Sequence, residues 1–315
     1  MLIVFNPTAG GRRRQRLDRA LQALGRHGVR AEVAETTRPG HATALAREAA
    51  GRGVPVVVAA GGDGTIAEVA AGLAGTEARL GILPLGTANV LAWELGVPLA
   101  PDRAAAVLAT GRLAVLWPGI ASFDDGTTRL FVQMLGAGFD AAVVAGLDLR
   151  LKRRLGRGAY VVQAAREVLR YRFPRFTAEL DGRAETVVSA IVTKGRFYAG
   201  RHLLAPDAMP GKAGFQVALF RDAGPLATAL YGMALPLGLL SRMPGVVIRA
   251  AARVRLVPGC REAEWVNGSA RAGLGAAIFP TQSDGDPAGL LPVTIEDAPG
   301  PIRVLLPAAS MTVAV

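Results

Sequence analysis

The chain has 315 residues, of which 51% are apolar and 19% charged, and its formal net charge is +11. This is the composition of a globular protein with a large core, so a disordered, collagen-like or coiled-coil chain is excluded, and the length predicts two domains. The single cysteine, Cys260, excludes a disulfide framework, and the first lysine, at position 152, excludes a P-loop or a protein-kinase lysine in the first half.

Strands and helices alternate over residues 1–110. The expected strands are Leu2–Phe5, Val29–Val33, Val54–Ala60 and Leu80–Leu83, and the expected helices are Arg12–His27, His41–Gly51, Ile66–Leu73 and Val90–Leu95. The strands are continuous apolar runs rather than alternating ones, which is typical of strands buried on both faces. The pattern therefore predicts an α/β domain whose parallel sheet is covered by helices on both sides.

The pattern changes near Pro118 to short apolar runs with turn signals between them, which predicts an antiparallel second domain. The expected strands are Trp117–Ser122, Leu130–Leu135, Thr177–Leu180, Thr186–Lys194, Gly214–Phe220, Val246–Leu256 and Ala276–Phe279. Helical insertions are expected at 141–172 and within 223–241. The second insertion is uncharged and about as long as a membrane span, but its prolines and glycines favour a soluble or membrane-grazing helix.

Three loops rich in glycine and small polar residues follow strands of the first domain: NPTAGG at 6–11, GGDGT at 61–65 and PLGTAN at 84–89. Ligands bind at the carboxyl ends of parallel strands, where such loops meet. Glycine lets the backbone approach a phosphate closely, and N–H groups at a helix start favour an anion. Any one loop is equally well explained as a tight turn, but three together predict a phosphate site, at which Asp63 can hold Mg²⁺ directly or through water.

These motifs resemble the diacylglycerol kinase catalytic-domain family, which includes bacterial lipid kinases, sphingosine kinases and ceramide kinases. The matching segments are NPTAGG at 6–11, TTRPGHA at 36–42, GGDGTIAEV at 61–69, GILPLGTANVLA at 81–92, GAGFDAAVV at 136–144, RRLGRGAYV at 153–161, LLAPDA at 203–208 and SDGDPAG at 283–289. The resemblance implies a nucleotide-binding domain like that of NAD kinases and phosphofructokinases over 1–117, completed by 301–315. It also implies a β-sandwich over 118–300 that carries a lipid cleft.

The resemblance further implies that ATP binds between the two domains, with Mg²⁺ as cofactor. The residues that it assigns to nucleotide binding are Asn6, Pro7, Ala9, Gly10, Thr36, Gly61, Gly62, Gly64, Thr65, Glu68, Gly86, Thr87 and Asn89. Asp63 is the expected Mg²⁺ ligand and a member of the catalytic group.

A general base is expected in the family's Asp-Gly-Glu motif, which reads Asp284-Gly285-Asp286 here. Phosphoryl transfer needs a carboxylate to accept the hydroxyl proton, and the residues leave Asp284 and Asp286 both open as that base. Asp-Gly is also the strongest short signal for a β-hairpin turn, so an ordinary turn is the alternative.

Three further positions follow from the resemblance. Asp140 either contacts the lipid headgroup, joins a Mg²⁺-linked network with Asp63, or caps the helix that follows it. The family often holds an accessory Mg²⁺ through an Asp after the LLAPDA motif. Ala213 stands at that position beside Lys212, so we expect this accessory site to be lost, with a lysine able to replace its charge.

The expected partners are a lipid substrate at a membrane surface and anionic phospholipids. Residues 150–175 contain nine Arg or Lys against one acid, with leucines and aromatics interleaved, which favours membrane docking over a merely solvated helix. No nucleic-acid module is present, so nucleic acid is not an expected partner. A homodimer is left open. The start of the sequence is not typical of a signal peptide, so the expected location is cytoplasmic with peripheral membrane association.

The expected function is transfer of the γ-phosphoryl group of ATP to a lipid hydroxyl, with diacylglycerol as the default substrate and phosphatidic acid as the product. Sphingoid bases, ceramide and other lipid alcohols stay open as substrates. One alternative is a catalytically degenerate regulator or carrier that binds nucleotide or lipid. Another is an enzyme like NAD kinase, which shares the GGDGT loop but uses other motifs in place of LPLGTAN.

Overall fold

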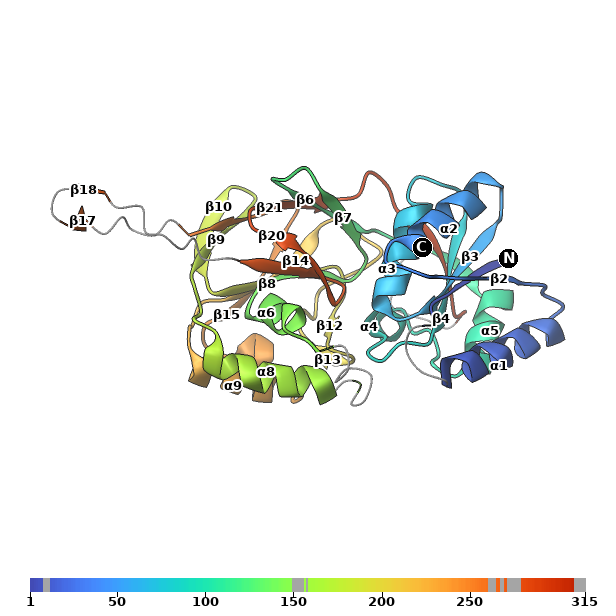
Figure 1. The fold of residues 1–315 in the computed structure, drawn as a ribbon, viewed down its shortest axis with the longest axis horizontal. Coiled ribbons are helices and arrows are strands. Elements are labelled where there is room, and N and C mark those ends of the chain that lie inside the picture. Colours follow the sequence, from blue (N-terminus) through green and yellow to red (C-terminus); the bar gives the residue numbers. More distant parts are fainter. Residues whose placement is uncertain are drawn as a thin grey trace.

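The computed structural model describes residues 1–7, 12–148, 156, 158–259, 265–266, 269–270 and 279–308. Two lobes lie side by side along the long axis of the molecule, the first mainly in blue and cyan with one red strand from near the C-terminus, and the second in green to red (Figure 1). The first lobe has a six-stranded sheet in the order β2-β1-β3-β4-β22-β5, in which the first five strands run parallel and β5 is antiparallel to β22.

The elements of the first lobe agree closely with the predicted alternation. Its strands are β1 (Leu2–Phe5), β2 (Glu32–Glu35), β3 (Val56–Gly61), β4 (Arg79–Pro84), β5 (Arg112–Leu116) and β22 (Ile302–Leu306), and its helices are α1 (Arg12–Arg26), α2 (His41–Gly51), α3 (Asp63–Leu73), α4 (Val90–Glu94) and α5 (Pro101–Thr110). Successive side chains of a strand point to opposite faces of a sheet. Leu2 and Val4 therefore pack with α2 and α3, while Ile3 and Phe5 pack with α1 and α5.

The second lobe is a sandwich of two antiparallel sheets, in the orders β10-β9-β16-β21-β6-β7 and β15-β14-β11-β8-β19-β20. The strands of the first of these sheets are β6 (Gly119–Phe123), β7 (Thr128–Phe131), β9 (Phe176–Leu180), β10 (Arg183–Val187), β16 (Val254–Pro258) and β21 (Val293–Asp297). Those of the second are β8 (Met134–Gly138), β11 (Ser189–Thr193), β14 (Phe215–Phe220), β15 (Val246–Ala251), β19 (Pro280–Ser283) and β20 (Asp286–Leu290). The inner faces share one core, in which the rings of Phe131 and Phe215 lie 6.0 Å apart between centroids.

Several segments differ from the prediction. The runs 130–135, 186–194 and 246–256 were each predicted as one strand, but each contains parts of two strands, because the chain passes there from one sheet of the sandwich to the other. α5, β5, β20 and β21 were not predicted. Of the predicted strand 276–279, residues 276–278 lie outside the described part of the chain, and β19 begins at Pro280.

The two helical insertions are also more broken than predicted. The first consists of α6 (Phe139–Ala145) and α8 (Gly158–Arg170), and the second of α9 (Pro225–Ala234) and a short 3₁₀ turn at Leu240–Arg242. Small two-stranded pairs lie at β12 (Phe197–Tyr198) with β13 (His202–Leu203), and at β17 (Trp265–Val266) with β18 (Ser269–Ala270). Within the described ranges, no helix combines the length and the apolar character that a membrane crossing needs.

Buried contacts join the two lobes beyond the chain crossings. Glu94 of α4 is 1% exposed and accepts hydrogen bonds from the backbone N–H groups of Arg196 (2.7 Å) and Phe197 (3.1 Å) and from Nε of Arg196 (2.9 Å). Val132, which follows β7, packs into the core of the first lobe. Removing one partner of a buried ion pair is costly, so these contacts hold the lobes in a defined arrangement.

The β19–β20 hairpin is fastened to the connection between β7 and β8 by the carboxylate of Asp284. Its Oδ2 accepts the N–H of Val132 at 2.8 Å, and its Oδ1 accepts the N–H groups of Gln133 and Met134, both at 2.9 Å. Asp284 and Gly285 both have positive φ, as a two-residue hairpin turn requires. Burial, with a smaller contribution from the nearby Asp63, raises the pKa of Asp284 to about 7 against the lowering effect of the three N–H bonds.

The raised pKa of Asp284 predicts a pH-dependent stability. A carboxyl whose folded-state pKa is raised stabilises the fold below its unfolded pKa of about 4, and this contribution is lost as the pH rises through about 7. The free energy of unfolding of the wild-type protein, taken relative to that of Asp284→Asn, should therefore be about 2–3 kcal/mol larger at pH 5 than at pH 8.

Denaturant unfolding of both proteins at the two pH values measures this difference, with Asp124→Asn, at an exposed turn position, as the matched control. The raised pKa of Asp284 would be contradicted if the free energy of unfolding of wild type relative to Asp284→Asn were the same at both pH values or larger at pH 8.

Candidate active site

Two of the three glycine-rich loops are in direct contact. A Cβ atom on Gly86 would collide with the Cα atom of Gly62, so only glycine allows the loops after β3 and β4 to approach this closely. The first loop reaches the same place, because Nδ2 of Asn6 donates a hydrogen bond to Oγ1 of Thr65 at 3.1 Å. A Cβ on Gly61 would collide with that Thr65 side chain. Asn6 and the loops after β3 and β4 therefore form one cluster at the carboxyl ends of β1, β3 and β4.

Asn89 closes the cluster in a strained conformation. Its φ is +48°, in the left-handed region, and its Nδ2 donates to the carbonyl of Gly86 at 2.9 Å. Its Oδ1 is buried and has no hydrogen-bond partner among the described residues. A buried acceptor without a donor is rare in native proteins, which points to a ligand donor at this position. Gly156 lies nearby, since a Cβ on it would be 3.3 Å from Cγ2 of Thr87.

Asp63 occupies the first position of α3 and reaches the start of α4. Its Oδ1 accepts the N–H of Leu91 at 3.0 Å. Burial raises the pKa of Asp63, while the N–H groups around Leu91 lower it. The carboxylate thus links two of the loops and lies close enough to Asp284 for their charges to interact.

Asp286 brings the second lobe to this cluster. A Cβ on Gly64 would collide with Oδ2 of Asp286, so this carboxylate lies directly against the glycine that follows Asp63. Asp286 is exposed, whereas Asp284 is buried with both oxygens held by backbone N–H groups. The two acids that the sequence could not distinguish therefore have different surroundings: Asp284 anchors the hairpin, and Asp286 faces the glycine-rich loop.

Asp140 belongs to a buried network that ends at the same hairpin. Its Oδ1 accepts the hydroxyl of Tyr198, and its Oδ2 accepts Nε2 of Gln282 at 2.7 Å. Gln282 in turn accepts the N–H of Gly285 at 2.9 Å. Burial raises the pKa of Asp140. Asp140 is not the cap of α6, as one alternative had it, because Gly138 holds that position and the Asp140 carboxylate turns toward Tyr198 and Gln282.

Other predicted site residues lie at the margin or beyond it. Glu68 accepts the N–H groups of Gly40 (3.0 Å) and Ala42 (3.1 Å) and so caps the start of α2. Thr36 is buried at the end of β2, where its N–H bonds to the carbonyl of Phe5 at 2.8 Å. Pro7 is exposed. Ala9 and Gly10 lie outside the described residues.

Several polar residues that organise the site were not predicted from the sequence. They are Arg16, Glu94, Gln133, Arg196, Tyr198 and Gln282. Arg16 shows how they act: its Nη2 donates to the carbonyls of Pro84 and Leu99, both at 2.8 Å, and thereby holds the third loop. Glu94 and Gln133, which interrupt apolar runs, gave a signal in the sequence, but such a signal does not identify the partner, and Arg16 lies in a charged stretch that gives none.

The residues present fit a nucleotide and a divalent cation. The glycine-rich start of α3 has no side-chain cap, so an anion could accept its N–H groups, and the unpartnered Oδ1 of Asn89 offers an acceptor for a ligand donor. Asp63 supplies a carboxylate oxygen, and Mg²⁺ is typically bound by one or two carboxylates together with substrate phosphates.

Comparisons with known proteins agree with this geometry. Residues 1–116 match the family described as the diacylglycerol kinase catalytic domain. The chain is 30% identical over 292 residues to a Stenotrophomonas maltophilia protein named "Probable lipid kinase YegS-like", which covers 89% of this chain and 88% of that protein. It is 31% identical over 228 residues to a diacylglycerol kinase of Bacillus subtilis, covering 70% and 73% of the two chains.

Solved structures show the same fold. A crystal structure of a diacylglycerol kinase from Bacillus anthracis superposes with a TM-score of 0.68 at 18% identity, covering 98% of this chain and 97% of that one. A second structure from the same organism has a TM-score of 0.75 at 19% identity. From the family match, the identity to lipid kinases over most of both chains and the two-lobed site, we conclude that this chain belongs to the diacylglycerol kinase catalytic-domain family of lipid kinases.

Proposed function

We propose that the protein transfers the γ-phosphoryl group of ATP to the hydroxyl of a lipid, with diacylglycerol as substrate and phosphatidic acid as product. The observation that carries the proposal is the approach of Asp286 to Gly64, which puts an exposed carboxylate of the second lobe against the glycine-rich loop of the first. A phosphoryl donor on that loop and a hydroxyl beside Asp286 would be neighbours. Phosphoryl transfer depends on this kind of positioning.

The first lobe would bind the triphosphate. The N–H groups of Gly64 and Thr65 at the start of α3 favour phosphate oxygens, and Asn6 orients the Thr65 side chain. Asp63 would hold Mg²⁺, directly or through water, and the cation would neutralise charge on the phosphates.

Asp286 is the proposed general base, and Asp284 is the residue that positions it. A pKa near 7 would suit a base, which favours Asp284. Geometry favours Asp286 instead, because Asp284 is only 8% exposed and its carboxylate already accepts three backbone N–H groups, which leaves little room for a substrate hydroxyl. Asp286 is two residues further along the hairpin and exposed on the side of Gly64.

Asp286→Asn should lower kcat by a factor of about 10²–10⁴, the usual contribution of a general base, with little change in the KM for ATP. Release of ADP that depends on diacylglycerol in detergent micelles measures the rate, and Asp124→Asn is the control at an exposed position of equal charge.

The assignment of the base would be overturned if Asp286→Asn turned over at the wild-type rate. A wild-type protein that binds ATP and lipid but releases no ADP in response to diacylglycerol would contradict the kinase proposal and favour a regulator or carrier.

We also infer that α9 and the adjoining α8 dock on a bilayer containing anionic phospholipid. Leu226, Leu230 and Met233 recur on one side of α9 at helical spacing, and Leu226 and Met233 are 75% and 61% exposed. No charged residue occurs between 223 and 241. An exposed helix face of this kind lies favourably at the boundary between headgroups and acyl chains.

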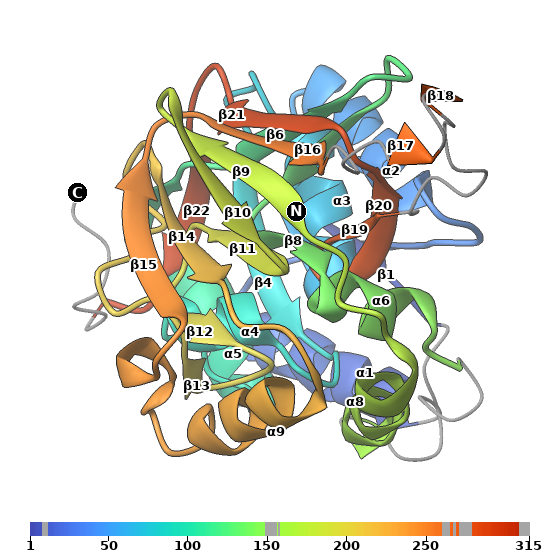
Figure 2. The ribbon, with the colours of Figure 1, turned by 90° about the vertical axis from the view of Figure 1, so that its left-hand side faces the viewer.

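The positive charge on α8, next to α9, favours a bilayer that contains anionic lipid. α8 contacts α9, and the two helices lie beside each other below the sandwich (Figure 2). Arg166 and Arg170 are exposed on α8, as is Leu169, at 82%. Arginines near a membrane surface are attracted to anionic headgroups, so apolar and basic side chains together favour an anionic bilayer.

A variant with Leu226→Asp and Met233→Asp should bind vesicles of phosphatidylcholine and phosphatidylglycerol at least about tenfold more weakly, because it loses two apolar contacts and adds repulsion. Co-sedimentation with the vesicles measures binding. Leu113→Ser, at an exposed leucine of the first lobe, is the matched control. Unchanged binding of the double variant, or equal loss in the control, would contradict docking through α9.

A further inference from the structure

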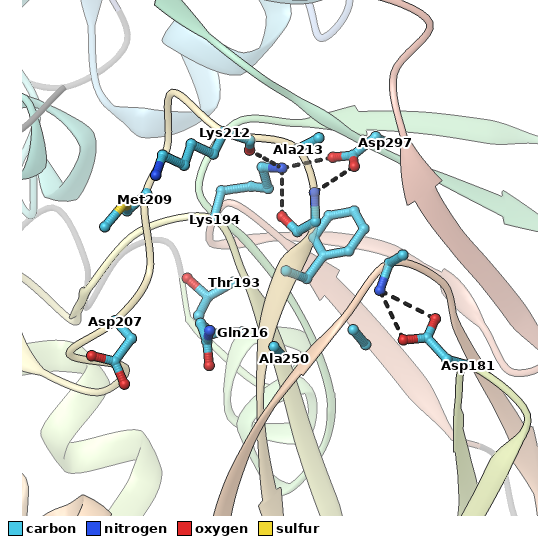
Figure 3. A pocket seen from close by; sticks show the side chains of 14 residues that line it. Asp181, Thr193, Lys194, Asp207, Met209, Lys212, Ala213, Gln216, Ala250 and Asp297 are labelled. Atoms are coloured by element: carbon cyan, nitrogen blue, oxygen red, sulfur yellow. Dashed lines mark hydrogen bonds and ion pairs between the residues drawn. The ribbon is translucent and has the colours of Figure 1, made fainter. Parts of the chain in front are cut away.

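Lys194, the residue after β11, has a fully buried side chain whose ammonium is surrounded by oxygen atoms. Its Nζ donates to the carbonyl of Lys212 at 3.0 Å, to the carbonyl of Gly214 at 2.7 Å and to Oδ1 of Asp297 at 2.7 Å. Figure 3 shows these bonds converging on the ammonium from the loop before β14 and from the end of β21. Since an ammonium has three N–H donors, all of them are satisfied.

The rest of the surroundings stabilise the charge. The second oxygen of Asp297 accepts the N–H of Gly214 at 2.5 Å, which ties the carboxylate to the same loop. The ammonium also lies 4.6 Å from the centre of the Phe215 ring, within range of a cation–π interaction. Burial lowers the pKa of Lys194, and Asp297 counteracts that shift. A buried charge persists only when it is paired in this way.

The loop before β14, residues 209–214, does not fit the accessory Mg²⁺ that members of the family often hold. Backbone carbonyls and a carboxylate are the oxygen ligands that a divalent cation takes, but here they all bind the ammonium. Ala213 offers no carboxylate, and a second cation would be repelled by Lys194. No group of three or more His, Cys, Asp or Glu side chains capable of holding a metal is found in the part of the chain that the structure describes.

This loop also contacts both chain crossings between the lobes. The N–H of Trp117, in the crossing from β5 to β6, donates to the carbonyl of Pro210 at 2.7 Å. Nε1 of Trp117 donates to the carbonyl of Ala298 in the crossing from β21 to β22, at 3.2 Å. Asp297 immediately precedes Ala298, so the ammonium joins the loop to the second crossing.

We propose that the Lys194 ammonium takes the place of a divalent ion beside the chain crossings between the lobes. In this place it positions Asp286 against Gly64. The assignment of Lys194 as a positioning residue rests on the proposed phosphoryl transfer, whereas its role as a cation does not. The sequence pointed to Lys212 as the replacement charge. The structure instead places the Lys194 ammonium in the loop, and Lys212 contributes only its backbone carbonyl and has an exposed side chain.

The first test needs neither ATP nor lipid, so its failure is distinct from failure of the kinase proposal. The Tm of the wild-type protein should be unchanged by EDTA. Lys194→Ala should lower the Tm by on the order of 10 °C, because three oxygens are left facing a buried space. Methylammonium should recover part of this loss by entering from the open surface pocket of about 460 Å³ that borders Lys194, whereas tetramethylammonium, which has no N–H donor, should not. Lys212→Ala is the matched control and should keep the wild-type Tm.

The second test concerns positioning. Lys194→Ala should lower kcat by up to about a hundredfold, the cost of a misplacement of about 1 Å, with the KM for ATP unchanged and with recovery by methylammonium. Should Lys194→Ala fail to fold, Asp297→Asn keeps the shape of the site, and it should show the same loss of kcat at constant KM.

The proposal would be overturned by a wild-type Tm that falls on addition of EDTA, by a Lys194→Ala protein with wild-type Tm and kcat, or by equal recovery with methylammonium and tetramethylammonium.

Discussion

The hydrogen bonds that the Asp284 carboxylate accepts are the constraint on which the rest of the site depends. Three backbone N–H groups of residues 132–134 fix it, and the β19–β20 hairpin is thereby fixed to the connection between β7 and β8. Val132 itself packs in the core of the first lobe, so this connection holds the hairpin against the first lobe as well as within the sandwich. Asp286, two residues on, lies against Gly64 as a consequence.

Three further contacts hold the same arrangement from different directions. Glu94 joins α4 to the Arg196 region, the network of Tyr198, Asp140 and Gln282 supports the hairpin turn from inside the sandwich, and Lys194 fastens the chain crossings. Each uses a buried polar group with its partners in place, which is expensive to disrupt. A site formed between two lobes needs such fastening, because neither lobe alone can fix the distance between donor and acceptor.

Local patterns account for what the sequence could predict. Continuous apolar strands and glycine-rich loops are short-range signals, so the parallel strands of the first lobe and the clustering of 61–65 with 84–89 follow from them. The split of 186–194 into two strands does not follow from local patterns, because Val187 and Val188 continue the apolar run where the chain changes sheet. The division of roles between Asp284 and Asp286 also could not be predicted, since it depends on which backbone N–H groups the folded chain brings to the hairpin. Lys194 was missed for a related reason: its oxygens come from residues 18, 20 and 103 positions away.

The most direct measurement is transfer of label from γ-labelled ATP to diacylglycerol in mixed micelles with Mg²⁺ present, with sphingosine, ceramide and a total lipid extract assayed in parallel. The account predicts labelled phosphatidic acid from the wild-type protein and almost none from Asp286→Asn. It would be contradicted by a protein that binds ATP and lipid yet labels no lipid of the panel.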